Sequence, residues 1–449
     1  MRGPIVVVGA GPAGALLATY LGRRGHDVIV YESRPDLRTN DIAGGRSINL
    51  ALATRGIVPL IDIGVIDRVD AITIPMRGRM VHAKDDPAPS LQPYGSKPHE
   101  VIHSVSRRDL NAILLDGAEA TGHVRIEFGA EVTEVDLAAS RLRFASGASA
   151  RFGTVFGADG AGSPVRHALG TAGACDWRTD WLEHRYKELT LAPAGDGSHR
   201  LDPHALHIWP RGELMLIALA NPGGDFTVTL FAPASTFDSL DSAAAVEAFF
   251  ADQFADFAAL VPDLADEFAA HPTGTLGTVR ATGWSLADRA VVVGDAAHAI
   301  VPFHGQGMNA AMESVRALDR HLRERPDDTA AAFRRFEAER KPDADAIADM
   351  ALDNYVEMRS GVVEADYLAR RALALELERR HPRHLSPRYN MVMFSTMPYA
   401  EARARAAAQA DIIGAALADP GVDVDALVRS LPPLPPLDPL ADPDALSIA

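Results

Sequence analysis

The chain has 449 residues, a formal net charge of −16, 47% hydrophobic and 23% charged residues, which excludes wholesale disorder. Its negative charge repels nucleic-acid phosphates and anionic lipid. Cys175 is the single cysteine, which excludes an intrachain disulfide and a cysteine-rich zinc site. We therefore expect a cytoplasmic protein that binds no metal, nucleic acid or membrane.

A βαβ unit is predicted at the N-terminus. Residues 5–8 are a β-branched run, residues 15–21 have helical apolar spacing, and residues 28–31 form a second apolar run. The uncharged stretch from Pro4 to Gly22 has the length of a membrane span, but its central glycines and Pro12 would break such a helix. The pattern favours strand, helix and strand.

The turn inside this unit reads Gly9-x-Gly11-x-x-Gly14. Gly9 permits a tight turn, Gly11 lets the backbone approach a pyrophosphate, and Gly14 lets helix and strand pack closely. Glu32, at the end of the second strand, is placed to accept hydrogen bonds from an adenosine ribose. A glycine-rich turn without a ligand is the alternative, but strand, helix and acid in register favour dinucleotide binding.

Two later strand patterns also end in an aspartate. Residues 155–158 lead into Asp159-Gly160, and residues 290–293 lead into Gly294-Asp295. A single aspartate at such a place is more often a turn former. Two of them, together with the N-terminal fingerprint, predict one discontinuous nucleotide-binding domain, because ligands bind at the carboxyl ends of strands in open α/β sheets.

The remaining segments predict a second sheet and a helical end. Residues 206–210, 214–219 and 226–231 look like antiparallel strands, whereas 327–358 and 367–380 have a helical period. We expect an α/β protein with a Rossmann-like FAD-binding domain, a mostly antiparallel substrate domain and a helical C-terminal part. The predicted parts are FAD-binding 1–72, 101–178 and 279–325, substrate 73–100 and 179–278, helical 326–430, and a Pro-rich tail 431–449.

The three nucleotide-binding elements together resemble the single-component FAD-dependent aromatic hydroxylases. The resemblance implies that Asp295 contacts the ribityl chain of FAD and that Asp159 lies near the pyrophosphate. In that group the nicotinamide nucleotide has no separate domain, and this sequence has no second βαβ fingerprint.

Over nearly its whole length the chain also resembles the kynurenine 3-monooxygenase family. The motifs that carry this resemblance begin at Gly45-Arg46-Ser47-Ile48-Asn49, Pro75-Met76-Arg77-Gly78-Arg79, Pro93-Tyr94-Gly95, Ser104, Tyr186-Lys187-Glu188-Leu189, His207-Ile208-Trp209-Pro210, Gly305-Gln306-Gly307-Met308-Asn309, Asn354-Tyr355 and Tyr389. The resemblance implies an enzyme that uses FAD, NADPH and O2 to hydroxylate L-kynurenine through a flavin C4a-hydroperoxide.

The same resemblance implies the site residues. Arg79 would pair with the substrate carboxylate, because a planar guanidinium suits a carboxylate. Without the resemblance, Arg79 would be interpreted as part of a surface salt bridge, and the other substrate contacts as residues with buried hydrogen bonds or as core residues. The other implied substrate contacts are Tyr94, Asn354, Tyr389, Leu206, Ile217, Leu219, Phe231 and Met358. The implied FAD contacts are Gly9, Gly11, Gly14, Glu32, Arg34, Ala51, Arg107, Asp159, Asp295, Gly307, Met308 and Asn309.

Residues Pro302, Phe303 and His304 are expected to lie against the flavin ring. His304 is interpreted as a wall residue, with a proton relay as the alternative, because the amino group of the substrate already activates its ring. The chain departs from the family pattern at Ala311-Met312-Glu313-Ser314, and we expect the protein to lack the membrane-anchoring extension of eukaryotic members.

Two alternative functions stay open. One is the same chemistry on a substituted kynurenine or another amino-aromatic acid, and the other is a flavin reductase that does not oxygenate. The expected partners are a small aromatic amino acid and O2, and the chain is expected to be a monomer or homodimer. The sequence does not separate NADPH from NADH.

Overall fold

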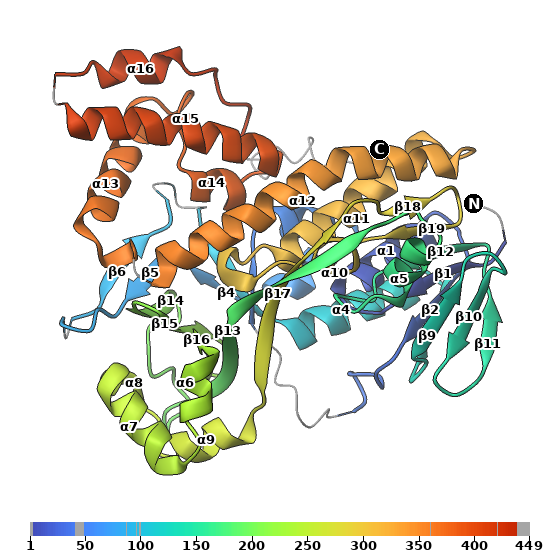
Figure 1. Ribbon diagram of the computed structural model, residues 1–449, viewed down its shortest axis with the longest axis horizontal. Coiled ribbons are helices and arrows are strands. Elements are labelled where there is room, and N and C mark those ends of the chain that lie inside the picture. Colours follow the sequence, from blue (N-terminus) through green and yellow to red (C-terminus); the bar gives the residue numbers. More distant parts are fainter. Residues whose placement is uncertain are drawn as a thin grey trace.

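The structure is a computed structural model that describes residues 3–40, 49–86, 88–95, 97, 100–359, 361–419 and 421–437. Two sheets dominate it, and the long helix α12 (Thr329–Arg359) runs above both of them in the view of Figure 1. The first four residues of the predicted motif at Gly45 and the end of the predicted tail, residues 438–449, lie outside the described residues.

The N-terminal sheet has six strands in the order β18-β19-β12-β1-β2-β8. All pairs are parallel except β18 with β19. Segments far apart in sequence thus join one sheet, as the sequence predicts for a discontinuous domain. The strands are β1 (Ile5–Val8), β2 (Val28–Glu32), β8 (Val124–Phe128), β12 (Thr154–Gly157), β18 (Ser285–Leu286) and β19 (Ala290–Val292).

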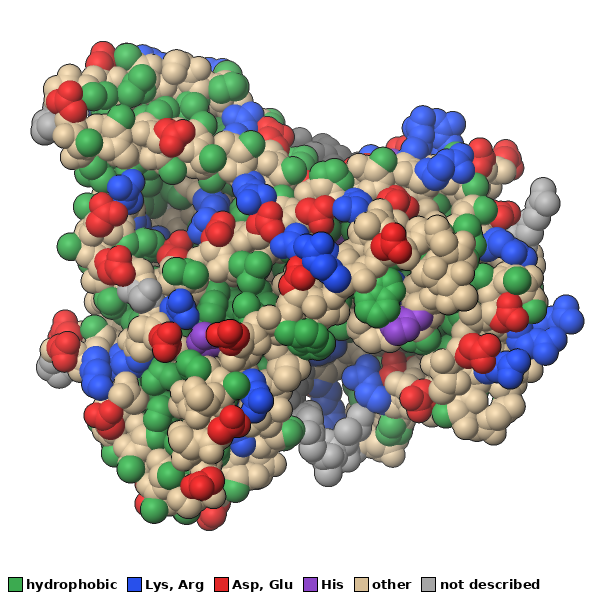
Figure 2. Space-filling view, viewed as in Figure 1, with side chains coloured by type: hydrophobic (Ala, Val, Ile, Leu, Met, Phe, Trp, Pro, Cys, Tyr) green, Lys and Arg blue, Asp and Glu red, His purple; other side chains and the backbone are tan. Residues whose placement is uncertain are grey.

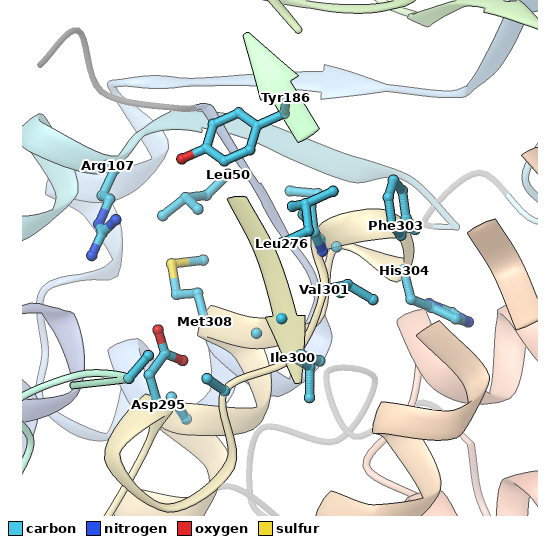
Figure 3. Close-up of a pocket in the computed structure, with 18 of the residues that line it drawn as sticks. Leu50, Arg107, Tyr186, Leu276, Asp295, Ile300, Val301, Phe303, His304 and Met308 are labelled. Carbon is cyan, nitrogen blue, oxygen red and sulfur yellow. The ribbon is translucent and has the colours of Figure 1, made fainter. Parts of the chain in front are cut away.

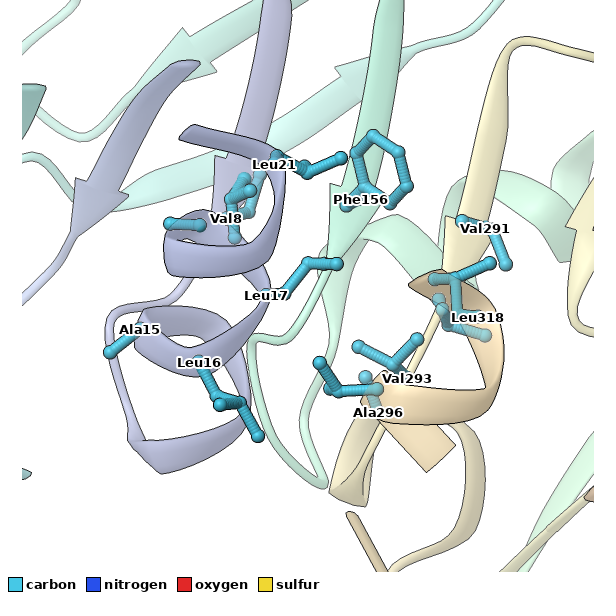
Figure 4. Close-up of a cluster of buried hydrophobic side chains, with 14 of the residues drawn as sticks. Val8, Ala15, Leu16, Leu17, Leu21, Phe156, Val291, Val293, Ala296 and Leu318 are labelled. Atoms are coloured by element: carbon cyan, nitrogen blue, oxygen red, sulfur yellow. The ribbon is translucent and has the colours of Figure 1, made fainter. Parts of the chain in front are cut away.

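Helices on this sheet bury its apolar side chains. Leu17 of α1 (Pro12–Arg23), Phe156 of β12 and Leu318 of α11 (Gly307–Glu324) are fully buried in one cluster (Figure 4). Strands buried on both faces read as continuous apolar runs, which explains the β-branched sequence of β1. The remaining helices of this part are α2 (Thr54–Asp62), α3 (Ile66–Asp70), α4 (Arg107–Glu119), α5 (Pro164–Thr171) and α10 (Asp295–His298).

The second sheet has seven strands in the order β17-β13-β16-β15-β14-β5-β6. The predicted strands at 206, 214 and 226 are its β14, β15 and β16. The sequence did not predict the 15-residue strand β13, which pairs with β16 and β17. The strands are β5 (Gly78–Val81), β6 (Ser90–Pro93), β13 (Trp177–Leu191), β14 (Leu206–Arg211), β15 (Leu214–Ala220), β16 (Phe226–Pro233) and β17 (Thr273–Ala281).

Four short helices below this sheet in Figure 1 also went unpredicted, and their phenylalanines pack in a core with strand residues such as Trp209 and Phe226. They are α6 (Ala234–Ser239), α7 (Ala243–Gln253), α8 (Ala255–Ala258) and α9 (Leu264–Ala270). Two three-stranded sheets complete the β structure. They consist of β3 (Asn49–Leu52), β4 (Thr73–Met76) and β7 (Ile102–Ser106), and of β9 (Val132–Asp136), β10 (Arg141–Phe144) and β11 (Ser149–Arg151).

The C-terminal part is helical, as predicted. The predicted helices at 327–358 and 367–380 are α12 and α13. Side chains of α12 and of the last helices share a buried cluster with Met76, Val81 and Phe303. The helices are α13 (Ala365–Arg380), α14 (Arg388–Met393), α15 (Tyr399–Ala418) and α16 (Val424–Ser430), with the 3-10 turns η1 (Pro302–His304) and η2 (Gly361–Val363).

Within the described residues, none of the helices has the length and apolar character needed to cross a bilayer. On the face shown in Figure 2, acidic and basic side chains are interspersed rather than gathered by sign.

Candidate functional site

A cavity of about 780 Å³ lies where the carboxyl ends of the parallel strands meet the seven-stranded sheet and the C-terminal helices. In Figure 3, Arg107 and Asp295 lie at one side of this cavity and Phe303 and His304 at the other. The structure therefore brings together predicted residues from all parts of the chain. Those lining the cavity are Gly11, Ala51, Arg79, Tyr94, Arg107, Leu206, Ile217, Leu219, Phe231, Asp295, Pro302, Phe303, His304, Gly307, Met308, Met358 and Tyr389.

The three glycines of the N-terminal turn have different surroundings. A Cβ on Gly14 would lie 1.9 Å from the Gly9 carbonyl oxygen, and one on Gly9, whose φ is +95°, would lie 2.4 Å from the Ala158 oxygen. A Cβ on Gly11 would meet no protein atom within 4 Å, and Gly11 lines the cavity. Gly9 and Gly14 thus serve packing, whereas Gly11 leaves open space where a phosphate would approach the helix N-terminus.

Glu32 ends β2 and is buried beside this turn. One of its carboxylate oxygens accepts a hydrogen bond from the Ala10 N–H at 2.8 Å, and the other accepts from Arg34 Nε at 2.8 Å. Burial opposes ionisation, but these hydrogen bonds lower the pKa of Glu32. Because an ionised carboxylate offers about four acceptor positions, capacity remains for the predicted ribose contact.

Two aspartates stand at the other strand ends. Asp159 is half-buried, and Asp295 is exposed to the cavity that it lines. Desolvation raises the pKa of Asp159 to about 6, and its Oδ1 has no hydrogen-bond partner among the described residues. Desolvation also raises the pKa of Asp295, while nearby Arg107 opposes that rise. A buried polar atom without a partner is rare in native proteins, so Asp159 Oδ1 favours a polar ligand here.

The loop before α11 closes the same region. The side chain of Asn309 donates to the Ala51 and Gly305 carbonyl oxygens at 2.8 and 2.9 Å, and it accepts from the Ala53 N–H at 2.9 Å. Gly305 has a φ of +66°, which suits glycine. Asn309 thereby fixes the loop against β3, and Gly307 and Met308 at the start of α11 face the cavity. The open turn, the strand-end aspartates and this loop fit FAD.

His304 is 3% exposed, and both its ring nitrogens lack a hydrogen-bond partner within the described part of the chain. Its ring stacks on Tyr389 with 5.6 Å between centroids. Burial, with Arg388 and Arg79 nearby, lowers the pKa of His304 to about 3. It is therefore a neutral and weakly basic ring at neutral pH.

Arg79 marks the other end of the cavity and is 5% exposed. Its guanidinium carbon lies 5.0 Å from the ring centre of Tyr389 and 6.0 Å from that of Tyr94, and these two rings stack at 4.9 Å. Burial opposes the charge on Arg79, but Tyr367, Tyr389 and Glu357 raise its pKa. A fixed cation thus lies among aromatic rings, ready for a carboxylate.

Sequence reasoning missed Glu357, which contacts this cation. Glu357 Oε1 lies 3.4 Å from Arg79 Nη1 and accepts a hydrogen bond from Tyr367 at 3.0 Å, while Oε2 accepts from Arg388 at 2.9 Å. The signal was present in Asn354-x-x-Glu357-Met358, since residues three apart on a helix lie on the same face.

The predicted amino-acid contact Asn354 does not line the cavity. Its amide donates to the Phe303 carbonyl oxygen at 2.6 Å and contacts the Met358 sulfur, so it supports the loop next to the site. Of the other predicted contacts, Gly9, Gly14, Glu32, Arg34, Asp159 and Asn309 do not line the cavity either.

Comparison with known proteins places this geometry in context. A family model described as FAD binding domain matches residues 2–351. A kynurenine 3-monooxygenase of Stenotrophomonas maltophilia is 48% identical over 418 residues, which is 91% of each chain. One from Myxococcus xanthus is 44% identical and covers 88% of this chain and 86% of its own.

Solved structures share the fold at lower identity. A 2-methyl-3-hydroxypyridine-5-carboxylic acid oxygenase aligns with a TM-score of 0.67 and 20% identity, over 82% of this chain and 95% of its own. The tetracycline destructase Tet(51) aligns with a TM-score of 0.61 and 19% identity, over 84% of this chain and 96% of its own.

Proposed function

The chain belongs to the kynurenine 3-monooxygenase family of FAD-dependent hydroxylases, and on this premise we propose that it hydroxylates L-kynurenine on the ring carbon beside the amine. NADPH and O2 are the co-substrates. One oxygen atom enters the ring, the other leaves as water, and NADPH becomes NADP+. Bound FAD supplies the transfer of electrons from NADPH to O2.

The single observation that carries the substrate assignment is the buried cation Arg79 in the aromatic end of the cavity, with Glu357 3.4 Å from it. An α-amino acid presents a carboxylate and an ammonium side by side. Arg79 would bind the carboxylate and Glu357 the ammonium, with Tyr94 and Tyr389 around them. Because Arg79 already pairs with Glu357, and Glu357 with Arg388, a zwitterion would join a network of paired charges, whereas an uncharged substrate would gain nothing from it.

The apolar wall would hold the aniline ring between this grip and the flavin loop. Leu206, Ile217, Leu219 and Phe231 come from β14, β15 and β16, so three adjacent strands shape one surface. Phe231 packs edge-on against Phe303 at 5.0 Å. These residues orient the ring and exclude water, so that positioning is the contribution of the protein.

Residues at the loop would hold FAD beside that ring. Asp295 would contact the ribityl chain, and the N–H groups at the start of α11 would favour negative charge on reduced flavin. His304, neutral and stacked on Tyr389, acts as a wall rather than a proton relay.

Turnover of the purified holoenzyme with L-kynurenine, NADPH and 18O2, followed by mass spectrometry, tests the proposal. We expect a product that is heavier by one labelled oxygen atom. A product labelled only when a ring-substituted kynurenine is supplied would instead support the substituted substrate. NADPH oxidation without any oxygenated product would support a reductase and contradict the proposal.

We further propose that the enzyme works in the cytoplasm as a monomer or homodimer and does not bind nucleic acid. The net charge of −16 and the single cysteine support this. Light scattering of the purified chain measures its mass. A larger assembly would contradict the monomer or homodimer.

A further inference from the structure

A chain of polar side chains lies on the face of the substrate sheet that points away from the cavity. His82 Nδ1 is 2.9 Å from Asp256 Oδ2, and His82 Nε2 is 2.9 Å from His207 Nδ1. His207 Nε2 is 2.9 Å from the carbonyl oxygen of Asp202, and Trp209 Nε1 donates to Asp256 at 2.8 Å. His82 and His207 are 7% and 2% exposed. This His82–His207 chain has no part in the site described above.

Counting protons shows which charge state completes the chain. Three contacts, Asp256–His82, His82–His207 and His207–Asp202, need one proton each. An ionised Asp256 with two neutral imidazoles provides two protons, so two ring lone pairs would face each other, or one would face the Asp202 carbonyl oxygen. One added proton satisfies every contact and pairs a buried imidazolium with the Asp256 carboxylate, whose side chain is 51% exposed.

The surroundings place that proton on His82. Burial opposes ionisation of Asp256, but hydrogen bonds from His82 and Trp209 lower its pKa to about 2, so this carboxylate stays ionised. Burial lowers the pKa of His207 to about 4, so His207 stays neutral and accepts at Nδ1. His82 then donates through both ring nitrogens, and Trp209 stacks on its ring at 4.1 Å.

Other charges near His82 are few and mostly exposed. Arg211 of β14 donates to the His82 carbonyl oxygen at 2.8 Å. The acidic charges that act on Arg211 are those of Asp256 and, more weakly, Asp85. Lys84 pairs with Asp252 of α7 at 3.7 Å on the surface. Of these groups only Asp256 contacts the His82 ring within the described residues, and it favours the cation.

The His82–His207 chain matters for the site because it joins strands β5 and β14, which also carry residues of the cavity wall. β5 is four residues long and pairs in parallel with β14 through three residue pairs, Arg79 with Leu206, Met80 with His207, and Val81 with Ile208. The His82 N–H extends the pairing to the Ile208 carbonyl oxygen at 2.9 Å. Successive side chains point to opposite faces, so Arg79 and Leu206 face the cavity while His207 faces the back.

We propose that His82 and His207 are positioning residues for substrate binding: protonated His82 links β5 to β14 through His207 and thereby fixes Arg79 and Leu206 in the cavity wall. Without the His82 ring this link is lost, and the short strand β5 then holds Arg79 less firmly. The inference rests on the proposed function for its kinetic consequence but not for the protonation state itself.

The kinetic test compares KM with kcat. In His82→Gln we expect KM for L-kynurenine to be about 10-fold higher than in the wild-type holoenzyme, with a smaller change in kcat. His123→Gln is the matched control, because exposed His123 also contacts an aspartate, Asp27, at 3.0 Å. A wild-type KM in His82→Gln, or an equal loss in kcat, would overturn the proposal.

A second measurement needs neither turnover nor a variant. Nitrogen NMR of histidine-labelled holoenzyme at pH 6.5 should show one buried histidine as an imidazolium with both ring nitrogens protonated. It should also show a neutral partner protonated at Nε2. Two neutral rings would overturn the proposal even if L-kynurenine is hydroxylated. One imidazolium beside one neutral ring would support the assignment even if L-kynurenine is not hydroxylated.

Discussion

Arg79 lines the aromatic end of the cavity and Glu357 lies 3.4 Å from it, the first on the short strand β5 and the second on α12. Two further side chains, Tyr367 and Arg388, hold Glu357 from behind. The pair therefore offers a fixed anion next to a fixed cation. This arrangement matches the two charged groups of an α-amino acid.

Replacing Glu357 with Gln tests this match. The amide keeps the size of the side chain but cannot neutralise an ammonium, so KM for L-kynurenine should rise about 10- to 100-fold. An analogue without the amino group should lose much less affinity. Steady-state kinetics with both compounds measures the difference. Equal losses for the two would show that Glu357 only orients Arg79.

His304 gives a prediction about pH with two readouts. Its pKa is about 3 in the folded protein, well below that of an exposed histidine, so the unfolded chain binds more protons between these values. The free energy of unfolding must therefore fall as pH decreases through this window. At pH 5 this loss in the free energy of unfolding is about 2 kcal/mol, and His304→Phe should abolish the loss.

Urea unfolding at pH 7 and pH 5 measures the first readout, with exposed His123→Gln as the control. The second readout is kcat. Because His304 is neutral from pH 6 to pH 9, His304→Phe should keep the wild-type pH profile of kcat. A large loss of kcat that depends on pH would instead favour the proton relay.

The predicted strands and helices with strong local patterns were confirmed, among them β1, β2, β14 and α12. Strand β13 was missed because its polar and apolar residues do not alternate evenly, and a register shift between Trp181 and Arg185 interrupts its pairing with β17. Pairing with strands distant in sequence, which no local window contains, stabilises it.

The functional site likewise has residues whose position the sequence predicts and residues whose position it does not. The position of Gly11 and Asp295 at the cavity could be predicted because a glycine turn or a strand end fixes their place relative to the sheet. Glu357 could not be identified as the partner of Arg79, since 278 residues separate them and tertiary packing alone brings them together. Asn354 was expected in the grip, but the loop carbonyl of Phe303 takes its amide.

Arg55 yields a prediction about the joint between domains. This side chain is fully buried on α2, donates to Glu313 of α11 at 2.7 Å and to the Val392 carbonyl oxygen at 3.0 Å, and lies 3.9 Å from the ring centre of Tyr399. It thus connects the FAD-binding part with α14 and α15.

Arg55→Met keeps most of the volume but leaves the Val392 carbonyl oxygen without this donor and removes one partner of Glu313. We expect a loss of about 3 kcal/mol in the free energy of unfolding. Thermal and urea unfolding measure it. Arg178→Met, at an exposed ion pair with Asp180, should change stability by less than about 1 kcal/mol and serves as the control.

Variants of two glycines in the N-terminal turn, Gly11 and Gly14, distinguish an effect on cofactor binding from an effect on folding. In Gly14→Ala the new Cβ would lie 1.9 Å from the Gly9 carbonyl oxygen, a backbone atom that cannot move cheaply. The helix must shift, so the apoprotein should lose stability. In Gly11→Ala the new methyl meets no protein atom within 4 Å and instead enters the space at the helix N-terminus.

Gly11→Ala should therefore leave the Tm of the apoprotein unchanged while it raises the Kd of FAD by about 10-fold or more, because the methyl keeps a pyrophosphate from the backbone N–H groups. Calorimetry of the apoprotein and flavin titration measure the two effects in each variant. If Gly11→Ala bound FAD as tightly as the wild type, the phosphates would not lie at this turn, and the placement of the cofactor argued from Gly11 and Asp295 would be wrong.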